Sequence, residues 1–158
     1  MSAPTTVRRV VSGGQTGVDR AAWAAARALG LEVGGWGPAG RWAEDGAVPA
    51  DVPGLLETAG ADPAERTALN VRDSDATLVF TRGAPAGGTA LTVEEAAALG
   101  RPLRVIDVDA DSPDEIVAGL RAWLVGVHPE VLNVAGPRES EAPGLGAVVE
   151  QLLLAALR

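Results

Sequence analysis

The chain has 158 residues, of which 47% are hydrophobic, and a formal net charge of −8. This length fits one domain that buries roughly two thirds of its unfolded surface, and no apolar run approaches the roughly 20 residues that cross a bilayer. The acidic charge argues against sequence-independent binding of nucleic acid or of an anionic membrane, whereas local arginines and helix ends can still hold a small anionic ligand.

The chain contains no cysteine, which excludes disulfides and thiolate metal sites. Its only histidine, His128, is expected to be structural, and no structural metal is expected because no second histidine exists to share one. The first ten residues lack the apolar stretch of a signal peptide. We therefore expect a cytoplasmic protein with one domain over residues 1–158, in which residues 1–6 form a short mobile segment.

A strand, a glycine loop and a helix are predicted at the start of the chain. The strand covers about residues 8–12, and the loop reads Ser-Gly-Gly-Gln-Thr-Gly over 12–17. Apolar residues at helical spacing predict the helix over 18–29. Glycines let backbone amides approach a ligand, and the first turn of a helix presents unsatisfied donors, so the pattern suits a phosphate, a carboxylate or an oxyanion. The alternative is a tight turn that needs glycine only for its backbone angles.

Residues 31–33 form the next predicted strand. Residues 34–61 show little periodicity and many Gly and Pro residues, and a stretch that long without regular structure is often functional. A helix over 62–71 follows, because Asp62 can cap it and Glu65 can reach back to that cap.

Three further strands are predicted, each followed by a helix. The elements are strands over 75–81, 103–108 and 131–135, with helices that follow the glycine loop 83–89 and end at Gly100, start at Ser112 and end near Gly126, and cover 145–157. Strands that alternate with helices predict an α/β fold whose parallel sheet is covered on both faces. We therefore expect a three-layer Rossmann-like sandwich with five strands.

The candidate site lies at one edge of this sheet. In such folds ligands bind beyond the carboxyl ends of the strands, where the strand order reverses. Three polar strand-to-helix loops with glycines, 12–19, 83–92 and 136–144, should meet there, and the segment around 36–45 should lie on the same edge. Together they can offer two helix N-termini and three arginines to a phosphorylated ligand: Arg20, Arg41 and Arg138.

Two kinds of candidate polar residue also have structural interpretations. Asp19, in the first turn of its helix, can favour the positive end of the helix dipole instead of touching a ligand. Thr89 and Thr92 can be helix caps, with Thr92 forming a capping box with Glu95.

The tryptophans and charges around Arg41 are equally open to two interpretations. Arg41 with Glu44 and Asp45 can be a solvated charge cluster. Trp36 and Trp42 flank Arg41 and can either stack on a flat heterocycle or cover the edge of the core.

Five stretches of the chain carry a family resemblance. They read SGGQTGVDRAA, GGWGPAGRWAEDG, RTALNVRDSDATLVF, GGTALT and LNVAGPRES. In this order they resemble the putative molybdenum carrier family of the SLOG superfamily, over nearly the whole chain. The resemblance implies a Rossmann-like fold with five or six strands, a homo-oligomer, and a site for the molybdenum cofactor, which is a phosphorylated pterin dithiolene, or for a related nucleotide.

The resemblance also implies which residues bind the ligand. They belong to the three glycine-bearing motifs: Gly13, Gly14, Gln15, Thr16, Gly17, Asp19, Gly87, Gly88, Thr89, Asn133, Gly136, Pro137, Arg138, Glu139 and Ser140. Arg20, Trp36, Arg41 and Thr92 complete the expected set. This expectation depends on Gly14 and Gly88 lying on one shared cavity.

The same superfamily contains phosphoribohydrolases marked by P-G-G-x-G-T-x-x-E, whose final Glu is catalytic. Here residues 85–92 keep the glycine-threonine core but place Thr92 where that Glu would be. Cleavage of an N-glycosidic bond needs a carboxylate, which threonine does not supply. We therefore favour a non-enzymatic carrier. The alternatives are a nucleotide hydrolase that uses Asp19, Glu44 or Asp45 instead, a nucleotide-sensing module, and a structural module with vestigial loops.

The last helix offers two uses for its apolar residues. They either form the surface of a homo-oligomer or cover the sheet of their own chain: Val148, Val149, Leu152, Leu153 and Leu154.

Overall fold

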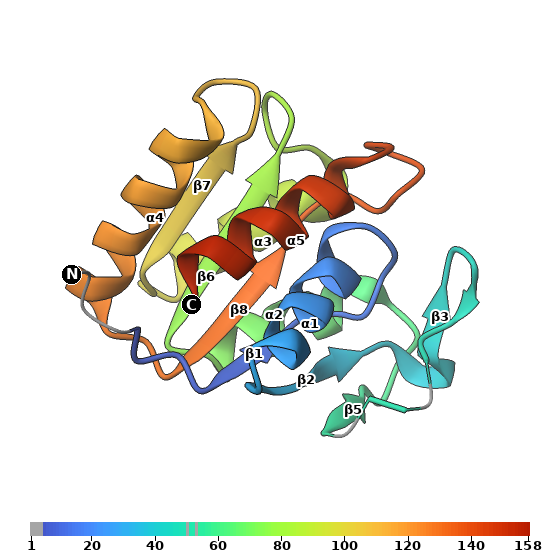
Figure 1. The fold of residues 1–158 in the computed structure, drawn as a ribbon. Helices are drawn as coiled ribbons and strands as arrows, with labels where there is room; N and C mark the ends of the chain where they lie inside the picture. The colour runs from blue at the N-terminus through green and yellow to red at the C-terminus, as the bar shows by residue number, and fades with distance from the viewer. Residues whose placement is uncertain (1–4, 50, 53) are drawn as a thin grey trace.

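The protein is a three-layer α/β sandwich in a computed structural model that describes residues 5–49, 51–52 and 54–158 (Figure 1). Its central sheet is parallel and has six strands in the order β5-β2-β1-β8-β6-β7. The strands are β1 (Arg9–Val11), β2 (Glu32–Gly37), β5 (Leu55–Glu57), β6 (Ala76–Thr81), β7 (Leu103–Asp107) and β8 (Val131–Ala135). The predicted Rossmann-like sandwich is confirmed, with six strands instead of the five found in the periodicity.

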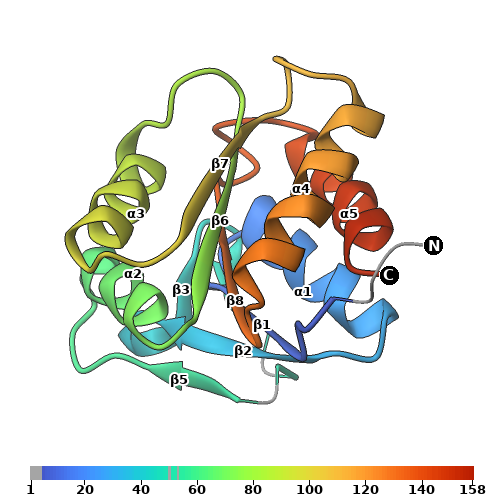
Figure 2. The ribbon, with the colours of Figure 1, turned by 90° about the vertical axis from the view of Figure 1, so that its left-hand side faces the viewer.

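Helices cover both faces of the sheet (Figure 2). One face carries α1 (Val18–Ala28), α4 (Pro113–Val127) and α5 (Leu145–Ala156), and the other carries α2 (Pro63–Arg72) and α3 (Gly87–Ala98). The core between them consists mainly of Val, Leu, Ile and Ala, together with Trp23 and Phe80. Small side chains of α1, such as Ala22 and Ala25, are fully buried and let this helix lie close to the sheet.

Side chains cap the starts of α2 and α4, but Glu65 does not make the contact that was predicted for it. The Asp62 carboxylate accepts a hydrogen bond from the Ala64 amide at 3.0 Å, and the Ser112 hydroxyl accepts one from the Glu115 amide at 3.3 Å. Glu65 does not reach back to the cap, because its carboxylate accepts from the amide of Gly60, at 3.2 Å, in the preceding turn.

The predicted caps of α3 were wrong. Thr89 and Thr92 both lie inside α3, whose N-cap is Ala86, and no side chain of a described residue caps its start. Thr92 instead donates its hydroxyl to the carbonyl of Gly88, one turn earlier, at 3.1 Å. The helix therefore begins with its first amides uncapped.

The segment 34–61 is more regular than its sequence indicated. Strand β2 continues to Gly37, where it pairs with β5. Glycine is needed at position 35 within it, because the backbone there has φ 126° and a Cβ atom would come within 2.3 Å of the Ser12 carbonyl oxygen. After it come a 3-10 turn η1 (Ala39–Arg41), the hairpin β3 (Trp42–Ala43) and β4 (Gly46–Ala47), and the edge strand β5. The other predicted elements agree with the structure to within about two residues.

The start of the predicted mobile segment, residues 1–4, lies outside the described residues. Thr6 is held in place, since its hydroxyl donates to the carbonyl of Pro129 at 2.8 Å. In the described part of the chain, no helix has both the length and the apolar character needed to cross a membrane.

Candidate functional site

A cavity of about 270 Å³ opens at the carboxyl ends of β1 and β8. Strands β2 and β5 lie on one side of this pair and strands β6 and β7 on the other, so the cavity lies where the strand order reverses, which is where α/β proteins bind ligands. Its walls come from the loop before α1, from α2, from the start of α3 and from the segment after β8.

Ten of the residues predicted to bind a ligand line this cavity: Gly13, Gln15, Asp19, Gly87, Gly88, Thr89, Thr92, Asn133, Gly136 and Arg138. The first glycine loop and the start of α3 therefore share one cavity, although Gly14 itself faces Trp23 and Val48 instead. These residues lie at the cavity, and their binding of a ligand stays a prediction.

Seven more predicted residues form the scaffold behind the cavity: Gly14, Thr16, Gly17, Arg20, Pro137, Glu139 and Ser140. The carbonyl of Pro137 accepts the first amide of α1, from Val18, at 3.3 Å. Gly17 lies against the same segment at φ 80°, and a Cβ atom there would come within 2.6 Å of the Pro137 carbonyl oxygen. These contacts fix the loop before α1 to the segment after β8.

Trp36 and Arg41 lie away from the lining of the cavity. The Trp36 indole donates to the Asp73 carboxylate at 2.8 Å, and the Arg41 guanidinium donates to the carbonyl of Pro49 at 2.6 Å. Arg41 is thus held by backbone carbonyls, and in the described part of the chain its guanidinium makes no ion pair with Glu44 or Asp45. Trp42 lines the cavity instead, with 49% of its surface exposed.

The two helix starts at this edge differ in what they can offer a ligand. Amides around the start of α1 already have partners. The Gln15 amide donates to the Asp19 carboxylate at 3.2 Å, and the Thr16 amide donates to the side-chain oxygen of Gln15 at 3.0 Å. The Val18 amide donates to the carbonyl of Pro137. The amides of Gly87 and Gly88 have no partner anywhere in the described part of the chain. A helix start of this kind is an anion-binding site in many proteins.

The carboxyl group of Asp19 lies in the wall of the cavity and is only 6% exposed. Burial raises the pKa of Asp19 to about 6, against the opposing effects of the Arg66 and Arg20 guanidinium groups and of amide hydrogen bonds from Gln15 and Gly13. Asp19 therefore changes its charge close to neutral pH, and its role in the first turn of α1 does not exclude a role in the cavity.

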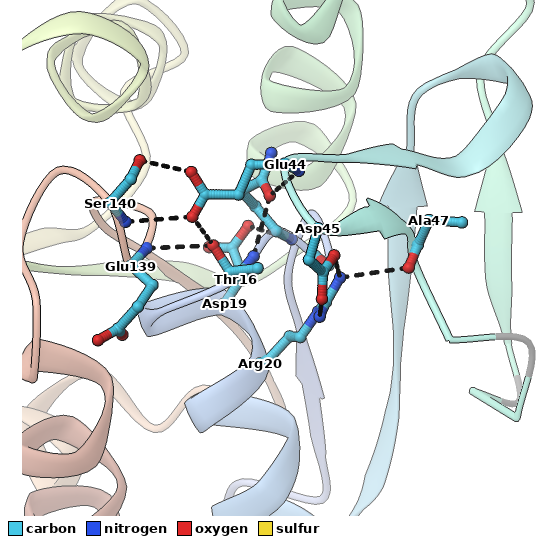
Figure 3. A network of polar contacts seen from close by, with 10 residues as sticks. Thr16, Asp19, Arg20, Glu44, Asp45, Ala47, Glu139 and Ser140 are labelled. Atoms are coloured by element: carbon cyan, nitrogen blue, oxygen red, sulfur yellow. Dashed lines mark hydrogen bonds and ion pairs between the residues drawn. The ribbon is translucent and has the colours of Figure 1, made fainter.

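Glu44, in the β3–β4 hairpin, contacts both the loop before α1 and the segment after β8 (Figure 3). Its carboxylate accepts hydrogen bonds from the Thr16 hydroxyl and from both the amide and the hydroxyl of Ser140, and it lies 3.8 Å from Arg138. The hydrogen bonds from Ser140 and Thr16 hold the pKa of Glu44 below its ordinary value.

Arg20 ties the same hairpin to α1. Its guanidinium pairs with the Asp45 carboxylate and donates to the carbonyls of Ala47 (3.3 Å) and Gly14 (3.1 Å). Glu44 and Asp45 are thus both engaged in holding the hairpin. Among the three carboxylates suggested for hydrolysis, Asp19 is the one that lines the cavity.

Sequence reasoning missed the contribution of α2 and of one acidic residue. Arg66 and Asn70 line the cavity, and Arg66 donates to the Gly13 carbonyl at 2.6 Å. Their spacing of four places them on one face of a helix, which was the available signal. Glu141 also lines the cavity and pairs with Arg138 at 3.3 Å.

The family of the chain follows from its sequence. The sequence model of the circularly permutated YpsA SLOG family matches residues 10–157. The chain belongs to this family. Among curated proteins, none matches it.

A solved structure is similar to this SLOG chain over its whole length. It is the 1.45 Å crystal structure of a protein from Syntrophus aciditrophicus SB named putative molybdenum carrier protein. The two chains are 38% identical, superpose with a TM-score of 0.95, and match over 99% of this chain and 98% of that one. The predicted family resemblance is therefore confirmed.

The cavity of this SLOG domain combines hydrogen-bond donors with one aromatic surface. The donors are the two free amides of α3 and the Arg66 guanidinium, and the aromatic surface is the indole of Trp42. Within the described ranges, no group of three or more acidic or histidine side chains is placed to hold a metal ion. The chemistry of these donors suits an anionic group attached to a flat ring.

Proposed function

We propose that this SLOG domain is a carrier that binds a phosphorylated heterocycle, either a pterin of the molybdenum-cofactor type or a related nucleotide. The single observation that carries the proposal is the uncapped start of α3, where the amides of Gly87 and Gly88 border the cavity without a partner in the described residues. The name of the similar Syntrophus aciditrophicus protein supports the pterin as the first ligand to test.

The phosphate is expected at the start of α3. A Cβ atom at Gly88 would meet nothing within 4 Å, so a phosphate has room to approach the backbone. The amides and the positive end of the helix dipole attract an anion there. Arg66 lines the same cavity from α2 and adds a full positive charge.

The ring is expected in the same cavity, against Trp42. Trp42 offers an exposed face for stacking, and Asn133, in the middle of β8, lines the cavity while its side-chain amide donates to the Thr77 hydroxyl at 3.3 Å. Molybdenum would enter as part of the ligand, held by the dithiolene of the pterin. Because Thr92 lies where the related hydrolases have their catalytic Glu, binding without turnover is the function that we favour.

The test is to measure the melting temperature with molybdopterin, ADP-ribose and AMP. A ligand at about 100 times its dissociation constant should stabilise the protein by about 2.7 kcal/mol. If none of these phosphorylated ligands raises the melting temperature, the proposal is wrong.

Gly88→Asp separates binding from folding. A carboxylate at the second residue of α3 interacts favourably with the helix dipole, by about 0.3–1 kcal/mol, so the fold should be as stable as before or more so. The same carboxylate occupies and repels the phosphate position, so ligand binding should be lost. Ala97→Asp is the matched control, because it adds the same charge to an exposed position at the other end of α3. Wild-type affinity in Gly88→Asp would contradict the proposed phosphate position.

A further inference from the structure

Strand β7 leaves one side of its backbone open at the edge of the sheet (Figure 1). In the described part of the chain, β6 is the only strand that pairs with it. That pairing uses the carbonyl of Pro102 and the amide of Val108, so the backbone groups of every second residue of β7 face β6. The amides and carbonyls of Leu103 and Val105, and the amide of Asp107, therefore face outward.

The side chain at the middle of this open edge is apolar. Val105 is 40% exposed, and Leu99, at the end of α3 on the same face of the sheet, is 46% exposed. Proteins usually protect an edge strand with lysine, proline or a bulge, because an open edge pairs with other chains. β7 contains neither lysine nor proline. It is therefore able to take a further strand.

On the other face of β7, the guanidinium of Arg104 lies against α4 without a partner. One of its nitrogens lies 2.7 Å from the position that a Cβ atom would have on Gly119, so this glycine makes room for it. Its Nε is buried and makes no hydrogen bond, and no carboxylate of the described residues pairs with the guanidinium. A buried donor without a partner is costly. A carboxylate from another molecule would therefore stabilise Arg104.

The side of α4 beside Arg104 combines one carboxylate with small residues. Glu115, Gly119, Ala122 and Gly126 recur at helical spacing and so share one side of the helix. Of these, Glu115, Ala122 and Gly126 are exposed, and the Glu115 carboxylate pairs with no described residue. Because small residues let two helices approach closely, this side of α4 can pack against another helix.

We propose that a second copy of this chain binds here, about a two-fold axis at Val105, so that one continuous sheet crosses both copies. Since every second residue faces outward, antiparallel pairing on that axis places Val105 opposite Val105 of the second copy, and Leu103 opposite Asp107 of the second copy. In both pairs, outward backbone donors then meet outward acceptors.

The same axis accounts for the unpaired charges on the α4 side. It places the two α4 helices side by side, in opposite directions, on one face of the shared sheet. α4 begins beyond the carboxyl end of β7, and antiparallel pairing brings this end beside the start of β7 in the other copy, where Arg104 lies. Glu115 of the second copy is thus expected to pair with Arg104, and the symmetry repeats this pair.

A second copy fits this surface better than an unrelated partner does. A two-fold dimer requires a self-complementary patch, and β7 with α4 carries both the unpaired cation and the unpaired carboxylate. The other sheet edge is less open, because β5 is three residues long and its Glu57 carboxylate accepts the Gly40 amide at 2.9 Å. None of the residues on the β7–α4 surface lines the cavity, so this inference does not depend on the proposed function.

Sedimentation velocity of Val105→Lys tests the shared sheet. The wild type should form dimers, and in Val105→Lys the dimer dissociation constant should rise at least about tenfold, because two lysines would face each other across the axis. Val105 is exposed in the single chain, so the variant should fold, which circular dichroism checks. Leu56→Lys, at the exposed centre of β5, is the matched control and should dimerise as the wild type does. A monomeric wild type, or unchanged dimer affinity in Val105→Lys, would overturn the inference.

An exchange of charges tests the ion pair between copies. Arg104→Glu and Glu115→Arg should each weaken the dimer several-fold, because each leaves like charges facing each other. The double variant restores opposite charges and should recover most of the wild-type affinity. Single variants that dimerise like the wild type, or a double variant without recovery, would contradict the proposed axis.

Cross-linking locates the axis, since the wild-type chain has no cysteine. Opposite residues whose backbones exchange hydrogen bonds have Cα atoms about 5.5 Å apart. A short bis-maleimide should therefore join Val105→Cys into a covalent dimer, under conditions where Leu56→Cys runs as a monomer on a denaturing gel. Equal cross-linking of the two variants would show that the copies do not meet at Val105.

Discussion

The carboxyl group of Asp19 is buried in the first turn of α1 and at the same time lines the cavity. It accepts the Gln15 amide at 3.2 Å, so it helps to hold the glycine loop in place. Its burial nevertheless opposes ionisation strongly enough to raise its pKa to about 6 despite Arg66 and Arg20 nearby. A carboxyl group with this pKa can change its charge within the cavity close to neutral pH.

Asp19→Asn should stabilise the protein at neutral pH. In the wild type the pKa rises from 3.8 to about 6 on folding, so stability falls as pH rises from about 4 to 6 and stays lowered above that range. At about 1.4 kcal/mol per pKa unit, the variant should be more stable by about 2–3 kcal/mol at pH 7.5, and the difference should vanish near pH 3.5. Denaturant unfolding at both pH values measures this.

Asp45→Asn is the matched control for that measurement. The hydrogen bonds from Arg20 hold the pKa of Asp45 below its ordinary value, so this exposed carboxylate contributes stability at neutral pH and loses it in acid. The two variants should therefore shift stability in opposite directions at pH 7.5. If Asp19→Asn were less stable than the wild type at that pH, the ionised buried carboxylate would stabilise the fold, and the prediction would be wrong.

At the level of elements, the sequence predicted what is local and missed what depends on distant contacts. The strand over 131–135, the cap Asp62 and the helix start at Ser112 were predicted correctly, because a buried run or a side chain beside its own helix decides them. Strand β5 was missed because a short, largely exposed edge strand has no apolar pattern. Arg66 was missed because its partner, Gly13, lies 53 residues away in the chain.

The β3–β4 hairpin is the element that Glu44 controls. Glu44→Gln should loosen it, because an amide is a weaker acceptor than a carboxylate for the bonds from Thr16 and Ser140 and no longer attracts Arg138. Amide hydrogen exchange across residues 42–47 should become several-fold faster at pH 7, with the core strands unchanged.

The same hairpin should loosen in acid in the wild type. Because the pKa of Glu44 is lowered by folding, its contribution is present above the ordinary carboxyl range and is lost as pH falls through the folded value. Glu32→Gln, which removes an exposed carboxylate from the start of β2, controls for the change in charge. Equal exchange in both variants would show that Glu44 does not hold the hairpin.

On the scale of the whole molecule, the last helix packs its apolar side chains into the core of its own chain. Val149, Leu152 and Leu153 of α5 are buried in the core, and Val148 is exposed. The apolar face that was a candidate for subunit contacts therefore packs against α1 and α4 of this chain and belongs to its core. The homo-oligomer stays a prediction, and it requires another surface.

The net negative charge of the whole molecule repels the anionic ligand that we propose. The sequence has 21 acidic and 13 basic residues, so binding an anion depends on the few charges around the cavity. Arg66 and Arg138 line it with positive charge, and Asp19 and Glu141 line it with negative charge. Of these, Asp19 has a pKa of about 6, so the cavity becomes less negative as pH falls through that value.

Affinity for an anionic ligand should therefore rise as pH falls from 8 to 5. ADP-ribose is the suitable probe, because its diphosphate stays ionised throughout this range. Its dissociation constant should fall by up to about tenfold in the wild type, which corresponds to a shift of about one pKa unit in Asp19 on binding. In Asp19→Asn the constant should be nearly independent of pH and should match the low-pH wild type. If the affinity of Asp19→Asn for ADP-ribose still depended on pH, a group other than Asp19 would cause the effect. The distant His128 is present in both proteins and would act equally in both.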